Sequence, residues 1–149
     1  MVAGAGLLLG LALWLLAQKS QTGRPGLELE NGQLRPCPAS PNCVSSQADP
    51  SDSVHYLPPI GFEGDPDIAW QRLIGIVARR PDARVIGQKD NYLRAEFRSR
   101  VFGFVDDVEF VLDPQAGKIH FRSASRVGYG DFGVNRRRIE AIRAEMKGL

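Results

Sequence analysis

The sequence predicts an α+β domain: an antiparallel sheet of three to four strands with an N-terminal and a C-terminal helix packed on one face, preceded by a transmembrane anchor. Three observations predict this class. Residues 2–17 are uncharged and leucine-rich, strand-like alternation recurs between residues 83 and 127, and an amphipathic helix pattern flanks those strands on each side. A chain of 149 residues, 43% hydrophobic and 24% charged, has the size of one such domain.

Residues 1–19 are predicted to form a signal-anchor helix. Val2 to Ala17 contains no charged side chain. At about 1.5 Å per residue it spans roughly 24 Å, somewhat less than a ~30 Å hydrocarbon core, and Gln18 and Lys19 could extend the reach. A cleaved signal peptide is the alternative, but no basic residue precedes the apolar run and Leu15 is too large for a good cleavage site at Ala17. We therefore expect an uncleaved anchor.

Residues 20–35 are polar and glycine-containing, which predicts a flexible linker before a domain over residues 36–149. Cys37 and Cys43 could form a disulfide in an oxidising compartment, the alternative being two free thiols in a cytosolic loop. Lys19 and Arg24 favour the cytoplasmic side, and the cysteine pair favours the opposite one. We expect the domain on the exported, periplasmic side.

Residues 36–66 are rich in proline and predict irregular structure, because proline fixes φ and removes a backbone donor. The first helix of the domain begins after Asp65, a good N-cap, with Pro66 at its first position. Its predicted apolar stripe is Trp70, Leu73, Ile74 and Val77.

Four strands are expected, at residues 83–88, 91–100, 104–113 and 118–127. The turn residues 114–117 predict that the last two form a hairpin. If Asp113 faces Lys118, Phe110 lies opposite Phe121 and Leu112 opposite Ile119 on the inner face. The same register pairs Glu109 with Arg122 and places Ser125 opposite Asp106.

The loop 128–133 matches G-x-G-x-x-G and precedes a helix expected at residues 134–147. A nucleotide cofactor is excluded, since that site needs a second parallel strand and a later acidic residue. Glycines, a helix N-terminus and arginines could instead bind an anion. The alternative is that Asp131 already caps the helix. The candidate ligand-binding residues are Arg122, Arg126, Gly128, Gly130, Gly133, Asn135, Arg136 and Arg137.

Strand alternation turns Asp106 toward the apolar face, where a carboxylate needs partners. A structural network would supply them, with members Asp106, Ser123, Ser125, Asp131 and Arg138. The alternative is catalysis, for which the candidates are Asp106, Asp107 and His120. On the outer face, Asp107 and Glu109 are expected to join neighbouring arginines in a solvated lattice of weak ion pairs.

Three separated segments resemble the family called domain of unknown function 1499. They are Cys37-Pro38 with Ser40 to Ser46, Gly103 to Phe110, and Arg122 to Gly128 with Asp131, Gly133, Asn135, Arg136 and Arg138. The resemblance covers residues 36–146. It implies a small exported or membrane-associated domain and names no activity.

The combined expectation is a membrane-anchored, non-enzymatic binding module that recognises an anionic lipid or an acidic envelope partner. The alternatives are a hydrolase or metal-dependent enzyme using Asp106, Asp107 and His120, and a purely structural envelope protein. The formal net charge of +2 is too small to indicate nucleic acid as a partner. No metal site or cofactor is expected.

Overall fold

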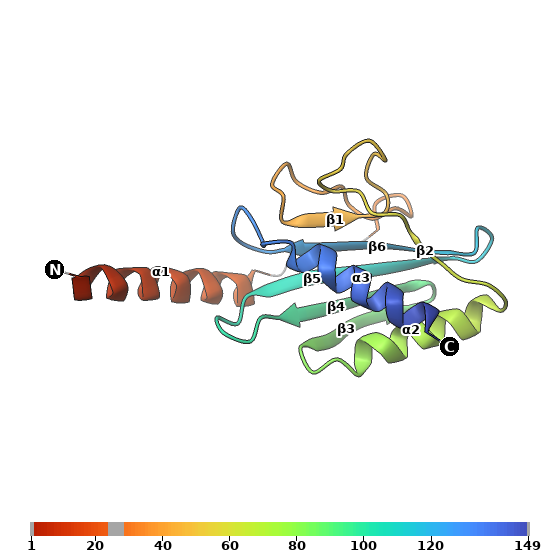
Figure 1. Ribbon diagram of the computed structural model, residues 1–149. Coiled ribbons are helices and arrows are strands. Elements are labelled where there is room, and N and C mark those ends of the chain that lie inside the picture. The colour runs from red at the N-terminus through yellow and green to blue at the C-terminus, as the bar shows by residue number, and fades with distance from the viewer. Residues whose placement is uncertain (1, 24–28, 149) are drawn as a thin grey trace.

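The computed structural model describes residues 2–23 and 29–148, without the side chains of residues 2–5 and 7. Its strands form one antiparallel sheet in the order β1-β6-β5-β4-β3, with β2 also paired to β6. Helices α2 (Pro66–Ala78) and α3 (Val134–Lys147) cover one face, and α1 (Val2–Thr22) projects from one end (Figure 1). The strands are β1 Cys43–Ser45, β2 Ile60–Gly61, β3 Ala83–Lys89, β4 Tyr92–Arg98, β5 Val105–Asp113 and β6 Lys118–Ser125.

The predicted α+β class is confirmed. The prediction of three to four strands is wrong, because the sheet has six strands in the described residues. The additional strands, β1 and β2, come from the proline-rich region that we expected to be irregular. Each pairs with β6, with Cys43 opposite Ala124 and Ile60 opposite Ile119. Both strands are short and lie in a proline-rich segment without strand-like alternation. They form because β6, a distant part of the chain, supplies their hydrogen-bonding partners.

The register of the β5–β6 hairpin is as predicted. Asp113 lies opposite Lys118, Phe110 opposite Phe121 and Glu109 opposite Arg122. Phe110 and Phe121 are fully buried against the helices. Turn chemistry and the two-residue period therefore determine this register locally.

Helix α2 begins as predicted, with the Asp65 carboxylate accepting the Asp67 amide at 2.8 Å and Pro66 at the first position. Its buried stripe includes Ile76, whereas Ile74 is only half-buried. Helix α3 buries Ile139, Ile142 and Met146, as its pattern predicted. Together these faces and the inner side of the sheet form one hydrophobic core.

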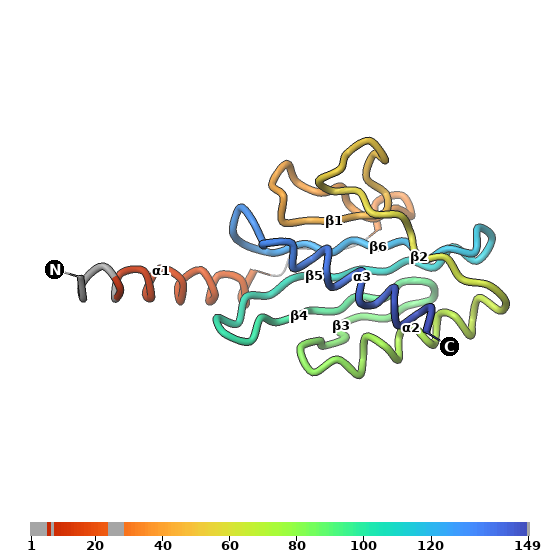
Figure 2. The backbone as a smooth tube through the Cα atoms, viewed as in Figure 1, coloured from red at the N-terminus to blue at the C-terminus, as the bar shows by residue number. Residues whose placement is uncertain are grey.

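Helix α1 extends to Thr22, beyond the expected end of the anchor at residue 19. Ala17 and Ser20 are buried against the domain, so the predicted linker begins with residues that belong to a docked helix. Figure 2 shows the rest of α1 extending away from the sheet. In the part of the chain that the structure describes, no helix is long and apolar enough to cross a membrane, which leaves the predicted transmembrane anchor unsupported. Arg24, used to predict orientation, lies outside the described residues.

The Cys37–Cys43 disulfide predicted as one of two alternatives is present. Cys43 is fully buried in β1, which pairs with β6. The disulfide therefore joins the segment that enters the domain to the edge of the sheet.

Candidate functional site

The Gly-rich loop, residues 126–133, joins β6 to α3, and its residue Asp131 caps the helix. One carboxylate oxygen accepts the Gly133 amide at 2.9 Å, and the other accepts the Asn135 amide at 2.8 Å. Gly128 and Gly133 have φ values of 87° and 74°, in the left-handed region that favours glycine. The Asp131 carboxylate thus takes backbone donors that an anion at this helix N-terminus would need.

Asn135, predicted as a ligand-binding residue, is instead completely buried at the centre of a hydrogen-bond network. Its amide nitrogen donates to the Asn42 carbonyl at 3.1 Å and to Ser125 Oγ at 3.0 Å. Its amide oxygen accepts from Ser123 Oγ at 2.6 Å. Asn42 in turn donates to the carbonyl of Gly128 at 2.7 Å. The segment before β1, strand β6 and the Gly-rich loop are therefore held together by two asparagines.

Arg138 connects this network to Asp106. Its Nη2 donates to Asp106 Oδ2 at 2.6 Å, and its Nη1 donates to Ser123 Oγ at 3.1 Å and to Asn135 Oδ1 at 2.6 Å. The guanidinium also stacks 4.7 Å from the centre of the Phe97 ring. The inward carboxylate thus has the partners that the structural interpretation required, and the pair fastens α3 to the sheet.

Arg136 and Arg137, the other candidate anion ligands on α3, contact backbone carbonyls. Arg136 Nη2 donates to the carbonyls of Ser53 and Val54 at 3.1 and 2.9 Å, which fixes the loop before β2. Arg137 Nη1 donates to the Phe132 carbonyl at 2.7 Å and is exposed to solvent. Only Arg137 of this pair therefore has the surface position that an external ligand needs.

Arg126 lies on the outer face of the sheet in a buried ionic cluster. It donates to Asp107 at 2.7 Å from both Nε and Nη2, and to Glu96 at 2.6 Å from Nη2. Its Nη1 donates to the Ser20 carbonyl of α1 at 3.1 Å. These two carboxylates together raise the pKa of Arg126, the bonds to Asp107 having the larger effect. The expected solvated lattice is therefore wrong for these groups, since Asp107, Glu96 and the Arg126 side chain are all buried.

Glu109 forms a second buried group on the outer face. It accepts the Tyr92 hydroxyl at 2.6 Å and lies 3.7 Å from Arg122 Nη1. Burial raises the pKa of Glu109 although both neighbours lower it. Burial also lowers the pKa of Arg122 and, together with Glu109, raises the pKa of Tyr92. Arg122, a second predicted ligand residue, is thus occupied by an internal carboxylate.

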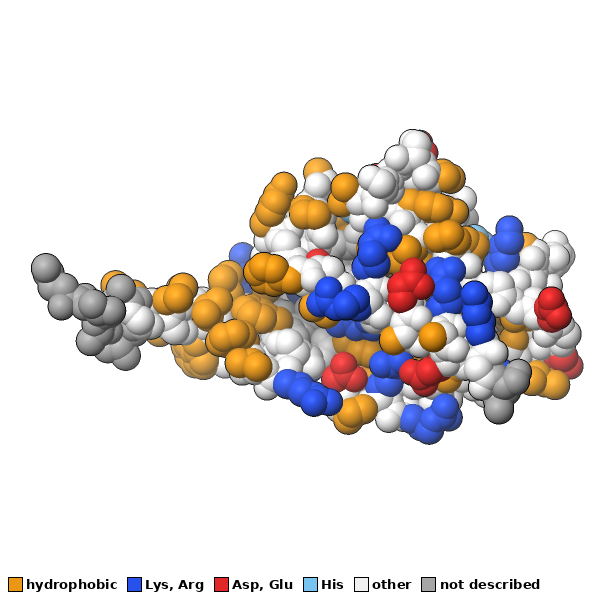
Figure 3. All heavy atoms as spheres, in the orientation of Figure 1, with side chains coloured by type: hydrophobic (Ala, Val, Ile, Leu, Met, Phe, Trp, Pro, Cys, Tyr) orange, Lys and Arg blue, Asp and Glu red, His pale blue; other side chains and the backbone are white. Residues whose placement is uncertain are grey.

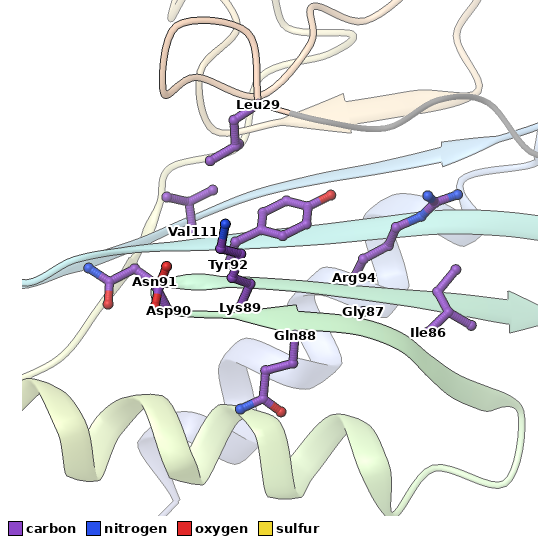
Figure 4. Close-up of a pocket in the computed structure, with 10 residues that line it drawn as sticks. All are labelled: Leu29, Ile86, Gly87, Gln88, Lys89, Asp90, Asn91, Tyr92, Arg94 and Val111. Carbon is purple, nitrogen blue, oxygen red and sulfur yellow. The ribbon is translucent and has the colours of Figure 1, made fainter.

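An open hollow of 710 Å³ lies beside this group (Figure 4). Tyr92, Arg94 and Val111 point to the side of the sheet on which Leu29 lies, away from α2. Its volume falls in the range of small-molecule pockets. The charged residues that line the hollow, Lys89, Asp90 and Arg94, all come from the β3–β4 hairpin. It offers no convergent set of catalytic groups among the residues that line it.

The three catalytic candidates do not meet. Asp106 faces the helices and Asp107 faces the opposite side of the sheet, each paired with an arginine. His120 contacts Ser46 Oγ at 3.1 Å and lies four residues from Ala124, the partner of Asp107, or roughly 13 Å along the strand. Within residues 2–23 and 29–148, no three His, Cys, Asp or Glu side chains are placed to hold a metal ion.

The fold and these contacts define a small α+β domain with an antiparallel sheet, two helices on one face and a motif network that links its segments. A family model described as protein of unknown function (DUF1499) matches residues 33–146, and the chain belongs to that family. Comparisons with curated proteins and with solved structures gave no match.

Sequence reasoning missed Asn42 and Ser20 as network members. Asn42 stands in an irregular, proline-rich segment, and Ser20 stands in a predicted linker, so neither has a periodic pattern that predicts burial. Asn42 does belong to the segment Ser40 to Ser46 that carries the family resemblance. That resemblance could have marked Asn42 as a candidate site residue.

Proposed function

We propose that this chain is a non-enzymatic module that is held at a membrane by α1 and binds an anionic partner at the membrane surface. The observation that carries the proposal is that α1 exposes apolar side chains while its C-terminal turn is docked on the domain. Several of its leucines are exposed, with Leu8 71% and Leu9 63% exposed, while its last turns are fixed to the sheet through Ser20.

The exposed apolar side chains of α1 make water an unfavourable surrounding for this helix. Leu8, Leu9, Leu11, Trp14 and Leu15 are all exposed, and they lie on more than one side of the helix. Burying one such side chain contributes about 1.5–3 kcal/mol. A helix with this character gains most from an apolar solvent, and a bilayer supplies one.

The disulfide supports the exported side. Disulfides persist in oxidising compartments such as the periplasm and are rare in the cytosol. Cys37 and Cys43 form one in a segment that contacts the central network of the domain. A periplasmic position therefore agrees with the chemistry of this segment.

The internal pairing of the buried carboxylates supports a binding function and not a catalytic one. Asp106, Asp107 and Glu109 each contact an internal cationic or hydroxyl partner. The exposed cations Lys19, Arg100 and Arg137 are available for recognition. Lys19 lies in α1, Arg100 in the loop between β4 and β5, and Arg137 in the first turn of α3. An anionic lipid headgroup or an acidic envelope protein would complement them.

Flotation of the purified full-length chain with lipid vesicles tests membrane attachment. The variant Leu9→Glu with Leu15→Glu should lose flotation, because it places two carboxylates in the helix that enters the bilayer. Gln115→Glu with Ala116→Glu adds the same charge in the exposed β5–β6 turn and should float like the unmodified chain. Equal flotation of both variants would exclude α1 as the attachment.

Vesicles with and without anionic lipid test the anionic partner. Arg100→Ala with Arg137→Ala should reduce the preference for anionic vesicles. Lys89→Ala with Lys118→Ala removes two exposed cations at the other end of the sheet and should preserve the preference. If no preference exists in the unmodified chain, an acidic protein is the remaining anionic partner.

A further inference from the structure

Two loops that are far apart in the sequence lie at the end of the sheet where α1 joins it (Figure 1). Residues 99–104 connect β4 to β5, and residues 126–133 connect β6 to α3. Between them, Ser20 of α1 is hydrogen-bonded to Val105 at the start of β5. The loops therefore flank the point at which α1 leaves the domain.

Both loops expose large apolar side chains. Val101 is 82%, Tyr129 77% and Phe132 96% exposed, and Phe102 is about half exposed. In Figure 3, hydrophobic side chains gather at this end of the domain and continue onto α1. A soluble surface rarely gathers apolar groups in this way without a partner.

Phe132 is also held in an unfavourable backbone conformation. Its φ of 53° lies in the left-handed region, which costs a bulky residue about 1–2 kcal/mol. The Phe132 side chain gains little burial within the described domain, because it is almost fully exposed. Strain combined with full exposure of an aromatic ring indicates that the loop presents this ring to something outside the domain.

An apolar hollow of 520 Å³ lies between α1 and the loops. Leu13 and Leu16 line it from α1, and Phe102, Phe104 and Phe132 line it from the loops. Its two carboxylates, Asp106 and Asp131, are already taken by Arg138 and by backbone amides. The hollow therefore presents mainly apolar surface that continues the surface of the helix.

We propose that this end of the domain is a second membrane-contacting surface, in which Val101, Phe102, Tyr129 and Phe132 enter the headgroup region and lipid acyl chains fill the hollow. The inference rests on the proposed attachment through α1. Continuity with the exposed leucines favours a bilayer over a second copy of the chain. So does the composition, because aromatic rings with nearby Lys19, Arg100 and Arg137 are typical of membrane interfaces. The domain thus lies directly on the bilayer with a fixed orientation.

Quenching by brominated lipid tests this contact in the full-length chain. All variants carry Trp14→Phe, because Trp14 of α1 would itself be quenched. The buried Trp70 contributes the same background fluorescence to every variant. Phe132→Trp places a reporter in the proposed surface. Gln115→Trp places the same reporter in the exposed turn at the opposite end. Brominated vesicles should remove most of the fluorescence added by Phe132→Trp and little of that added by Gln115→Trp.

Three results would separate the possibilities. Equal, weak quenching of both reporters in chains that still float with vesicles would overturn this inference and leave attachment through α1 intact. A Phe132→Trp signal that is blue-shifted but unquenched would indicate a second protein copy and would also overturn it. If the unmodified chain does not float with vesicles, the proposed function itself is overturned.

A second experiment measures vesicle partitioning of variants in which exposed apolar residues are replaced by serine, without a fluorescent reporter. Phe102→Ser with Phe132→Ser should weaken partitioning into limiting amounts of vesicle. Val54→Ser with Ile68→Ser removes exposed apolar side chains elsewhere and should leave partitioning unchanged. The same loss in both pairs would contradict a surface localised at the α1 end.

Discussion

Ser20 in α1 and Val105 at the start of β5 share two hydrogen bonds. The Val105 amide donates to Ser20 Oγ at 2.7 Å, and that hydroxyl lies 3.2 Å from the Val105 carbonyl, to which it donates. Both groups are buried. One serine side chain therefore connects α1 to the first residue of β5, and it fixes the direction in which α1 leaves the sheet.

Ser20→Ala should lower the free energy of unfolding by about 1–3 kcal/mol, because the buried Val105 amide would lose the Ser20 hydroxyl that accepts its hydrogen bond. Thermal unfolding of the full-length chain measures the effect. Thr22→Ala is the matched control, since the exposed Thr22 hydroxyl bonds only carbonyls of its own helix. Similar small shifts for both variants would show that α1 is not docked through Ser20.

Arg138→Ala should destabilise the domain by about 3 kcal/mol, since it leaves the inward Asp106 carboxylate without its cation. Asp106→Asn alone should also destabilise, and the double variant should cost less than the sum of the two. Arg137→Ala, the exposed neighbour, should change stability by less than about 0.5 kcal/mol. If the losses of unfolding free energy from the two single variants added up in the double variant, direct coupling between Asp106 and Arg138 would be contradicted.

Glu109 should make the domain less stable as pH rises. Its folded-state pKa is raised above the unfolded value of 4.5, chiefly by burial, so the folded protein binds the extra proton in that interval. Stability therefore falls as pH increases from 4.5 through the raised pKa. Glu109→Gln should flatten this fall in denaturant titrations at several pH values. Glu63→Gln, an exposed control, should retain the wild-type slope.

The two histidines should titrate on opposite sides of the ordinary value of 6.5. A hydrogen bond from His55 to Asp52, 2.6 Å long, raises the pKa of His55, whereas burial lowers the pKa of His120. The stabilisation from His55 is complete below pH 6.5 and disappears as pH rises through its raised pKa. Ring NMR signals measure both values. Asp52→Asn should return His55 toward 6.5 without moving His120, and unchanged titration of His55 would refute the assigned cause.

Reduction of the Cys37–Cys43 disulfide should lower the free energy of unfolding by about 2 kcal/mol, as expected for a short closed loop. Intact mass after alkylation should show both cysteines protected in protein isolated from its native cells and not reduced. Cys37→Ser with Cys43→Ser should unfold at the same temperature as the reduced wild type. Free thiols in the native protein would place the domain in a reducing compartment.

Local pattern was sufficient for the centre of the fold. The turn at residues 114–117 and alternating side chains determined the pairing of Phe110 with Phe121, because a register slip would turn every apolar residue outward. The Asp65 cap and the 3.6-residue period likewise determined α2. The same alternation turned Asp106 inward and brought Ser125 opposite it.

The tertiary structure alone decided what covers the sheet and what completes its edge. Strand β1 forms because β6 offers free backbone groups to a proline-rich segment that has no strand pattern of its own. Glu109 and Asp107 are buried because other segments cover part of the outer face. Leu29 lines the same hollow as Tyr92, and the Ser20 carbonyl accepts a hydrogen bond from Arg126. Alternation predicts which side a residue faces, but coverage of that side depends on segments distant in the chain. For that physical reason the sequence identified the motif residues, and only the folded chain separated internal partners such as Asn135 from exposed groups such as Phe132.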